Sequence, residues 1–357
     1  MRVNPSIHYL WVLLLALCSV SMAAEKPVIE VLGTGGTIAG TQASAQAGTG
    51  YKSATLTVTD MIMAIPGVQD SATVTGVQIA NVGSQDMTHD IWLTLAAYLN
   101  ERASASDVDG FVITHGTDSL EETAYFLHRV YTGSKPVALT AAMRPADAVS
   151  ADGPGNMLAA IKAAASPGLG GDVFVVMNGR FHHPRFVSKR HTENPDAIRS
   201  VGGGLFGEMV NGRATFYPNA VCRPAPVDVS EVKQLPPVPI YYMHVGHDPG
   251  LIDVLVERGS RGIVTAGYGN GNTGRAVEMA LVKARRAGVM VVRSSKVGDG
   301  TVSRNVEIND DANGFVAAYD LSPQKARIEL TLVLVAGIAP DRLQQQYARD
   351  NCAVATR

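Results

Sequence analysis

The feature that most constrains this chain is the alternation of short apolar runs with longer segments of helical spacing. Runs rich in Val and Ile, each closed by glycine or a polar turn, occur at 27–33, 76–82, 110–116, 136–143 and 173–179. Amphipathic spacing is found between them, at 86–104 and 118–133. Strands that are apolar at nearly every position are buried on both faces, as in parallel sheets covered by helices. The sequence therefore predicts an α/β fold with a mostly parallel sheet flanked by helices.

A proline-rich segment divides the chain. Residues 223–239 carry five prolines and no apolar periodicity, which is typical of an extended linker. Beyond it the β-rich runs return at 240–246, 262–272 and 288–295, with helical spacing at 248–260 and 273–288. We therefore predict a larger N-terminal α/β domain over 24–222, a linker over 223–239 and a smaller C-terminal α/β domain over 240–357.

The first residues have the pattern of a secretory signal. Arg2 precedes an apolar run, and Ser21 and Ala23 are the small residues expected at −3 and −1 of a cleavage site. We expect residues 1–23 to be removed and the protein to be exported. No later apolar run is long enough to cross a bilayer, so we expect no membrane attachment after cleavage.

Charge and cysteine content narrow the possible partners. The balance of 30 Lys+Arg against 32 Asp+Glu has no basic excess of the kind that binds nucleic acid. Only Cys222 and Cys352 remain after the signal, and in an exported protein they could pair or stay apart. Two cysteines are too few for a cysteine-based metal site.

The glycine-rich turn at 33–37 suggests either phosphate binding or a nucleophile. A dinucleotide fingerprint would need a third glycine where Ile38 stands, and the Lys-Ser/Thr pair of a phosphate loop is missing. A hydroxyl turned out of a strand end, as at Thr37, can attack a carbonyl if a partner activates it. Tyr51, at the end of the following loop of small residues, is a candidate partner. The simpler alternative is that Thr37 only satisfies a backbone group of the turn.

Two other loops that follow strands carry polar groups. Thr117 and Asp118 stand just before a predicted helix, where capping by Asp118 or Ser119 explains one polar residue but not the set. Lys189 is a cation that a carboxylate could hold and that could tune a threonine hydroxyl, although most lysines are simply solvated.

Amide and hydroxyl side chains on further loops could bind a small polar substrate. Ser84 and Gln85 follow the run at 76–82, and Asn270 and Asn272 lie in "GNGNTG" at 269–274. That segment matches G-x-G-x-x-G, but no acidic residue follows about 20 positions on, so the match to a nucleotide site is weak.

Taken in order, these segments resemble the bacterial type II periplasmic L-asparaginases over essentially the whole chain after the signal. The matching segments are "TGGTIAG" at 34–40, "GSQDM" at 83–87, "GFVITHGTDSLEETAYFL" at 110–127, "AMRP" at 142–145, "SADGPGNMLAA" at 150–160, "VVRSS" at 291–295 and "SPQKAR" at 322–327. The resemblance implies hydrolysis of L-asparagine to L-aspartate and ammonia, without metal or organic cofactor, in the periplasm.

The resemblance also assigns catalytic roles by position. Thr37 matches the family's nucleophile, which forms an acyl-enzyme, and Tyr51 matches the tyrosine of the loop that closes over it. Thr117, Asp118 and Lys189 match a second catalytic group, whose threonine contacts the reacting amide.

Substrate recognition is implied in the same way. Ser84, Gln85 and Asp118 match residues that hold the α-amino and α-carboxylate groups. Asn272 and Glu307 match residues that a neighbouring subunit of a homotetramer supplies, and Gln85 and Asn272 resemble the members that prefer asparagine and hydrolyse glutamine more weakly. The loop before Tyr51 is about one residue longer than in the family pattern, so Tyr51 matches by pattern rather than by counting.

Two other function classes remain as alternatives. A periplasmic amino-acid-binding protein shares the signal, the size and the two-domain plan, but does not need a threonine on a glycine turn. A zinc hydrolase is suggested by His182, His183, His244 and His247, although no H-E-x-x-H helix accompanies them.

Overall fold

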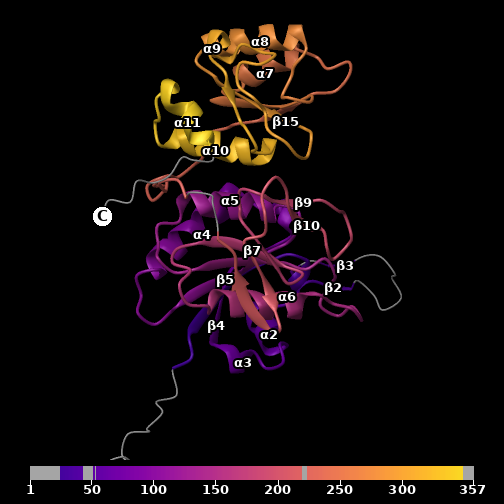
Figure 1. The fold of residues 1–357 in the computed structure, drawn as a ribbon, viewed down its shortest axis with the longest axis vertical. Coiled ribbons are helices and arrows are strands. Elements are labelled where there is room, and N and C mark those ends of the chain that lie inside the picture. The colour runs from indigo at the N-terminus through magenta and orange to yellow at the C-terminus, as the bar shows by residue number, and fades with distance from the viewer. Residues whose placement is uncertain (1–24, 43–50, 53, 219–222, 349–357) are drawn as a thin grey trace, which may run out of the picture.

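The computed structural model describes residues 25–42, 51–52, 54–218 and 223–348 (Figure 1). The predicted signal at 1–23 and both Cys222 and Cys352 lie outside the described residues. Figure 1 shows a larger body built by the N-terminal part and a smaller one built by the C-terminal part, with helix α10 (Pro323–Val335) on the side of the smaller body that faces the larger one. The predicted α/β class is confirmed.

The larger body contains an eight-stranded sheet in the order β12-β11-β8-β7-β6-β5-β1-β4. The five strands from β7 to β4 in this order run parallel, and β8, β11 and β12 add antiparallel strands at one edge. The strands are β1 (Val28–Gly35), β4 (Thr73–Val82), β5 (Gly110–Thr114), β6 (Val137–Thr140), β7 (Val173–Met177), β8 (Arg180–His182), β11 (Gly207–Val210) and β12 (Arg213–Phe216). The hairpin β2 (Thr41–Gln42) with β3 (Tyr51–Lys52) and the pair β9 (Val187–Lys189) with β10 (Ile198–Ser200) lie beside it.

The central strands bury both of their faces, as their uniform apolar sequences predict. In β5, Phe111 and Ile113 belong to one hydrophobic cluster, while Val112 between them belongs to the cluster on the opposite face. Helices α4 (His89–Arg102) and α5 (Leu120–Val130) cover the first face, and α2 (Val58–Met63), α3 (Val68–Ser71) and α6 (Gly153–Ala164) cover the second. The period-2 alternation of a strand therefore divides one apolar run between two cores.

The smaller body is a four-stranded parallel sheet in the order β13-β14-β15-β16. Its elements are β13 (Ile240–Tyr242), α7 (Gly250–Glu257), β14 (Gly262–Gly267), α8 (Arg275–Arg286), β15 (Met290–Ser295), α9 (Asp310–Asn313), β16 (Val316–Ala317), α10 and α11 (Leu343–Tyr347). Helix α10 packs on this sheet and on α5, so that one hydrophobic cluster runs through both bodies. No helix in the described part of the chain is both long and apolar enough for a bilayer span.

Residues 223–239, all of which the structure describes, form neither helix nor strand. The segment is nevertheless anchored, because Val227 and Val238 are buried and the Val227 amide donates to the Arg129 carbonyl at 2.8 Å. Its lack of helix and strand agrees with its proline content, and its buried apolar side chains attach it to the shared core.

Candidate active site

The turn that ends β1 carries Thr37 to the carboxyl edge of the large sheet. Gly35 and Gly36 have φ of 104° and 81°, a backbone region that favours glycine. The Gly36 amide donates to the Val82 carbonyl at 2.8 Å, which fixes the turn to the neighbouring strand β4. Thr37 then begins the short helix η2 (Thr37–Ala39), where it is buried.

Glycines allow three loops to touch at this edge. A Cβ built on Gly36 would lie 2.4 Å from the Gly116 amide nitrogen, and one built on Gly116 would lie 2.5 Å from Ser84 Oγ. These residues follow β1, β5 and β4, which are adjacent parallel strands. Loops at the carboxyl ends of such strands are the usual ligand site of an open α/β sheet.

Lys189 joins the second predicted group. It ends β9, and its Nζ donates to Thr117 Oγ1 at 2.9 Å and to Asp118 Oδ1 at 2.6 Å. Its own backbone amide donates to Glu121 Oε2 at 3.1 Å, so α5 and the loop before it hold the lysine at its backbone and at its ammonium group. The Lys189 side chain is 20% exposed and that of Asp118 is 56% exposed, which leaves the carboxylate accessible to a ligand.

Ser84 connects the loop after β4 to the same group. Its hydroxyl accepts from the Asp118 amide at 3.1 Å, and its carbonyl accepts from Ser119 Oγ at 2.6 Å. Ser119 stands at the N-cap position of α5, but its side chain makes no capping hydrogen bond, so of the two capping residues that the sequence allowed, Ser119 does not cap through its hydroxyl. The hydroxyl is used instead to join two loops of the site.

His115 stabilises the loop between β5 and α5 from behind. Its Nδ1 lies 2.7 Å from the Gly116 carbonyl, and its Nε2 lies 2.9 Å from Thr123 Oγ1, which also accepts from Trp92 Nε1. Complete burial lowers the pKa of His115 to about 4, although the bond to Gly116 acts in the opposite direction. The ring is therefore neutral at neutral pH and supports the loop.

A cavity of about 280 Å³ opens beside these residues. Ser84, Gln85 and Asp118 line one part of it. Another part is formed by a group that sequence reasoning missed, consisting of His89, Trp92, Glu122 and Arg327.

Arg327 brings the smaller body to this cavity. It comes from α10, and its Nη2 lies 3.3 Å from Glu122 Oε2 while its guanidinium lies 6.0 Å from the Trp92 ring centre. Burial raises the pKa of Glu122, and Arg327 lowers it in part. The only sequence signal for Arg327 is that it ends the segment "SPQKAR", one of those that match the family. Its contact with Glu122 could not be predicted, because the two residues are 205 positions apart in the chain.

The predicted residues of the smaller body form a pair of their own. Asn272 Nδ2 donates to Glu307 Oε2, and Asn272 Oδ1 is buried without a hydrogen-bond partner in the described part of the chain. Within that part, neither residue bonds to Ser84, Asp118 or Lys189. A single chain therefore forms two separate polar groups.

The position of Tyr51 is given only by its backbone. Strand β3 pairs with β2, so that Tyr51 lies opposite Gln42. Because β2 follows shortly after β1 and Thr37, this pairing places the Tyr51 backbone near the same part of the chain. The Tyr51 side chain lies outside what the structure describes.

The histidines that suggested zinc are arranged differently from a metal site. Among the described residues, no three His, Cys, Asp or Glu side chains come together as ligands. His183 packs edge-on against His128 with ring centres 4.9 Å apart. Burial, aided by the charges of Lys325 and Arg185, lowers the pKa of His183 to about 3.

Known proteins resemble this chain over most of its length. The family model "Asparaginase, N-terminal" matches residues 28–222, and "Glutaminase/Asparaginase C-terminal domain" matches residues 237–347. "L-asparaginase 2" of Escherichia coli is 41% identical, with 91% of this chain and 94% of that protein covered. "Probable L-asparaginase periplasmic" of Haemophilus influenzae is 40% identical, with 93% of this chain and 98% of that protein covered.

A solved structure agrees in fold. It is titled "Probable Cytoplasmic L-asparaginase" from Campylobacter jejuni, has a TM-score of 0.86 and 40% identity, and covers 91% of this chain and 100% of its own. Sequence, both family models and fold lead to one conclusion: the chain belongs to the asparaginase family.

Proposed function

We propose that the protein hydrolyses the side-chain amide of L-asparagine to L-aspartate and ammonia, and L-glutamine more slowly. The observation that carries the proposal is the contact of Lys189 Nζ with both Thr117 and Asp118, on a loop that touches the Thr37 turn. Membership of the asparaginase family supports the same reaction.

The substrate is a small zwitterion with little surface to bury, so its recognition depends on placed charges and hydrogen bonds. Asp118 binds the α-ammonium group with its exposed carboxylate. Ser84 and Gln85 bind the α-carboxylate. A neighbouring subunit of a homotetramer adds its Asn272 and Glu307, which explains why these two form a separate group within one chain.

The chemistry proceeds in two halves. Thr37 Oγ attacks the amide carbon, the C–N bond breaks, and ammonia leaves with the proton that the hydroxyl gave up. Water then attacks the resulting ester, releasing L-aspartate and restoring the Thr37 hydroxyl. Tyr51 assists removal of the Thr37 proton, and Thr117, held by Lys189, positions the amide and then the water. The scheme uses no metal and no organic cofactor.

Location and domain limits belong to the same proposal. We assign residues 1–23 to an export signal and the protein to the periplasm, on the pattern of its N-terminal sequence. The name of the Haemophilus relative includes "periplasmic", whereas the Campylobacter structure is titled "Cytoplasmic". The domains are 24–222 and 240–357, with the linker 223–239 between them.

Ammonia release from L-asparagine and from L-glutamine, measured with and without a chelator, tests this proposal. We expect faster release from asparagine and no effect of the chelator. An amino-acid-binding protein would instead gain thermal stability from asparagine without releasing ammonia. Loss of activity with the chelator would favour the zinc hydrolase.

A further inference from the structure

We infer that Arg293 is a positioning residue that sets Asn272 and Glu307 in the arrangement in which they bind substrate. The inference rests on the proposed function, in which Asn272 and Glu307 bind the substrate, because Arg293 would act on the reaction only through these two residues. Arg293 lies on β15, between the loop that carries Asn272 and the segment that carries Glu307.

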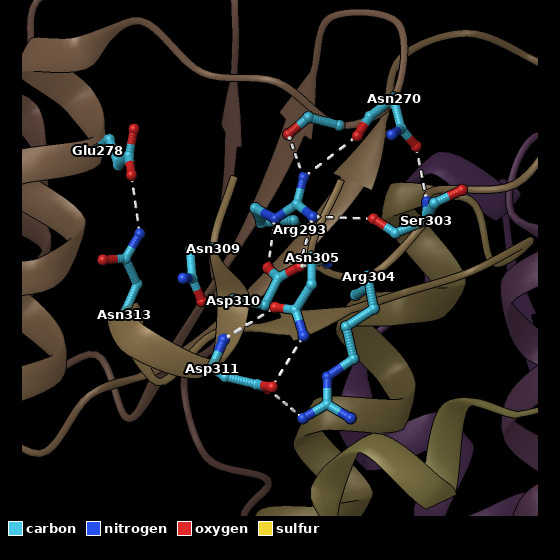
Figure 2. Close-up of polar contacts among 12 residues, drawn as sticks. Asn270, Glu278, Arg293, Ser303, Arg304, Asn305, Asn309, Asp310, Asp311 and Asn313 are labelled. Carbon is cyan, nitrogen blue, oxygen red and sulfur yellow. Dashed lines mark hydrogen bonds and ion pairs between the residues drawn. The ribbon is translucent and has the colours of Figure 1, made fainter. Parts of the chain in front are cut away.

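Arg293 forms a two-point ion pair with Asp310 in the interior of the smaller body (Figure 2). Its Nε donates to Asp310 Oδ1 at 2.6 Å and its Nη2 to Oδ2 at 2.7 Å. The two side chains are 1% and 0% exposed. This parallel arrangement fixes the plane of the guanidinium and leaves its other donors in defined directions.

Those remaining donors bind backbone carbonyls on two loops. Nη1 donates to the carbonyls of Asn270 at 3.1 Å and Gly271 at 3.2 Å, which immediately precede Asn272. Nη2 donates to the Ser303 carbonyl at 3.2 Å. One side chain therefore ties the loop after β14 to the segment that leads to Glu307.

Two further bonds close the arrangement. Asn270 Oδ1 accepts from the Ser303 amide at 2.6 Å, and Asp310 Oδ2 accepts from the Asn305 amide at 2.9 Å (Figure 2). Glu307 thus lies on a short span anchored at Asn305 and at Asp310. The exposed Glu307 side chain meets Asn272 from this fixed base.

A role in geometry explains why an arginine is buried here. A buried ion pair adds little net stability compared with well-packed apolar side chains, because both charges lose their water. A planar fork of five donors, however, can satisfy a carboxylate and three carbonyls at once, and lysine cannot reproduce that set of directions. Arg293→Lys therefore keeps the charge opposite Asp310 and loosens the two loops.

The test compares Arg293→Lys with Arg129→Lys in ammonia release from L-asparagine. Arg129 is the matched control, because its ion pair with Glu329 at 2.7 Å is equally buried but joins α5 to α10. We expect Arg293→Lys to raise KM about tenfold, the effect of losing one bond to a charged group, with kcat changed less than about threefold. Arg129→Lys should lower Tm and change KM less than Arg293→Lys does.

A double-mutant cycle with Asn272→Ala separates positioning from general damage. If Arg293 acts in part through Asn272, the two effects on KM overlap, and the KM of the double variant rises by clearly less than the product of the two single effects. Independent multiplication of the two effects would overturn the inference, as would a KM for Arg293→Lys equal to that of the unmodified protein. If Arg293→Lys does not fold, Asn270→Ala takes its place in the same cycle, since it removes the bond to Ser303.

The outcomes for the two proposals differ. Absence of ammonia release by the unmodified protein would refute the proposed function. An active parent whose KM is insensitive to both Arg293→Lys and Asn270→Ala would refute the positioning role alone.

Discussion

Lys189 Nζ lies 2.6 Å from Asp118 Oδ1, although the two residues are 71 positions apart in the chain. The lysine is mostly buried and the carboxylate is mostly exposed. The cation therefore orients one oxygen of Asp118, and the exposed carboxylate remains available to a ligand. The same ammonium group donates to the Thr117 hydroxyl, so one lysine holds both the residue that we propose to bind the α-ammonium group and the residue that we propose to position the amide.

Replacing Lys189 with Met should lower kcat for asparagine by about 10²–10⁴, the range found for groups that assist proton transfer. The methionine retains the length of the side chain and removes the charge that holds Thr117 and Asp118. Lys283→Met is the control, because Lys283 also pairs with a carboxylate, Asp253 at 2.9 Å, but on an exposed surface. Equal kcat values in the two variants would contradict the assignment.

Gly36→Ala should destabilise the protein and abolish activity, since its Cβ would lie 2.4 Å from the Gly116 amide at a φ of 81°. Gly246→Ala is a matched control for backbone strain alone, with φ of 77° and open space around the new methyl group. We expect the control to cost roughly 1–2 kcal/mol for its backbone conformation. Gly36→Ala should cost a further 1–3 kcal/mol or so for overpacking. Urea unfolding measures both, and equal losses would show that the loops need not touch.

Stability should decrease as the pH falls from 6.5 toward 4. Burial lowers the pKa of His115 and His182 to about 4 and that of His183 to about 3, below the ordinary value of 6.5. In this window the unfolded chain binds protons that the folded chain does not, so each histidine contributes up to about 1.4 kcal/mol per pH unit.

Chemical unfolding at several pH values checks this slope. His182→Gln should reduce it, because His182 is buried with its Nδ1 2.9 Å from Ser200 Oγ. A stability that does not change between pH 4 and 6.5 would contradict the burial of these rings in neutral form.

The kcat/KM for asparagine should exceed that for glutamine by roughly 10–200-fold, the discrimination that a binding pocket achieves against one additional methylene group. Gln85 lines the cavity beside Asp118, and Asn272 meets Glu307. Gln85→Glu and Asn272→Ser change the two side chains that, by resemblance, accompany a preference for asparagine, and each should narrow the ratio. A ratio unchanged in both variants would remove these positions from specificity.

Much of this fold could be predicted because its strands are apolar on both sides and its helices between strands are amphipathic. Helix α10 could not be predicted in this way, because most of its residues are buried, including the charged residues Lys325 and Glu329. Without a polar face, a helix has no periodic pattern to detect. The antiparallel strands β8, β11 and β12 were missed because they are short edge elements.

Some residues of the candidate site can likewise be predicted from the sequence, and others cannot. Thr117, Asp118 and Lys189 were predicted to act together, and the structure joins them directly. Arg327 was not predicted to line the cavity with Asp118, since its place depends on how α10 packs against α5. Local motifs identify residues of a loop, whereas contacts between distant elements follow only from tertiary packing.

The central claim is that the Thr37 hydroxyl performs the attack, and ammonia release by Thr37→Ala and Thr37→Ser tests it most directly. Alanine removes the hydroxyl from a buried position without adding volume, and serine restores it. We expect Thr37→Ala, shown by its circular dichroism to be folded, to release no ammonia from L-asparagine, and Thr37→Ser to retain measurable turnover. Release by Thr37→Ala at a rate near that of the parent would contradict it.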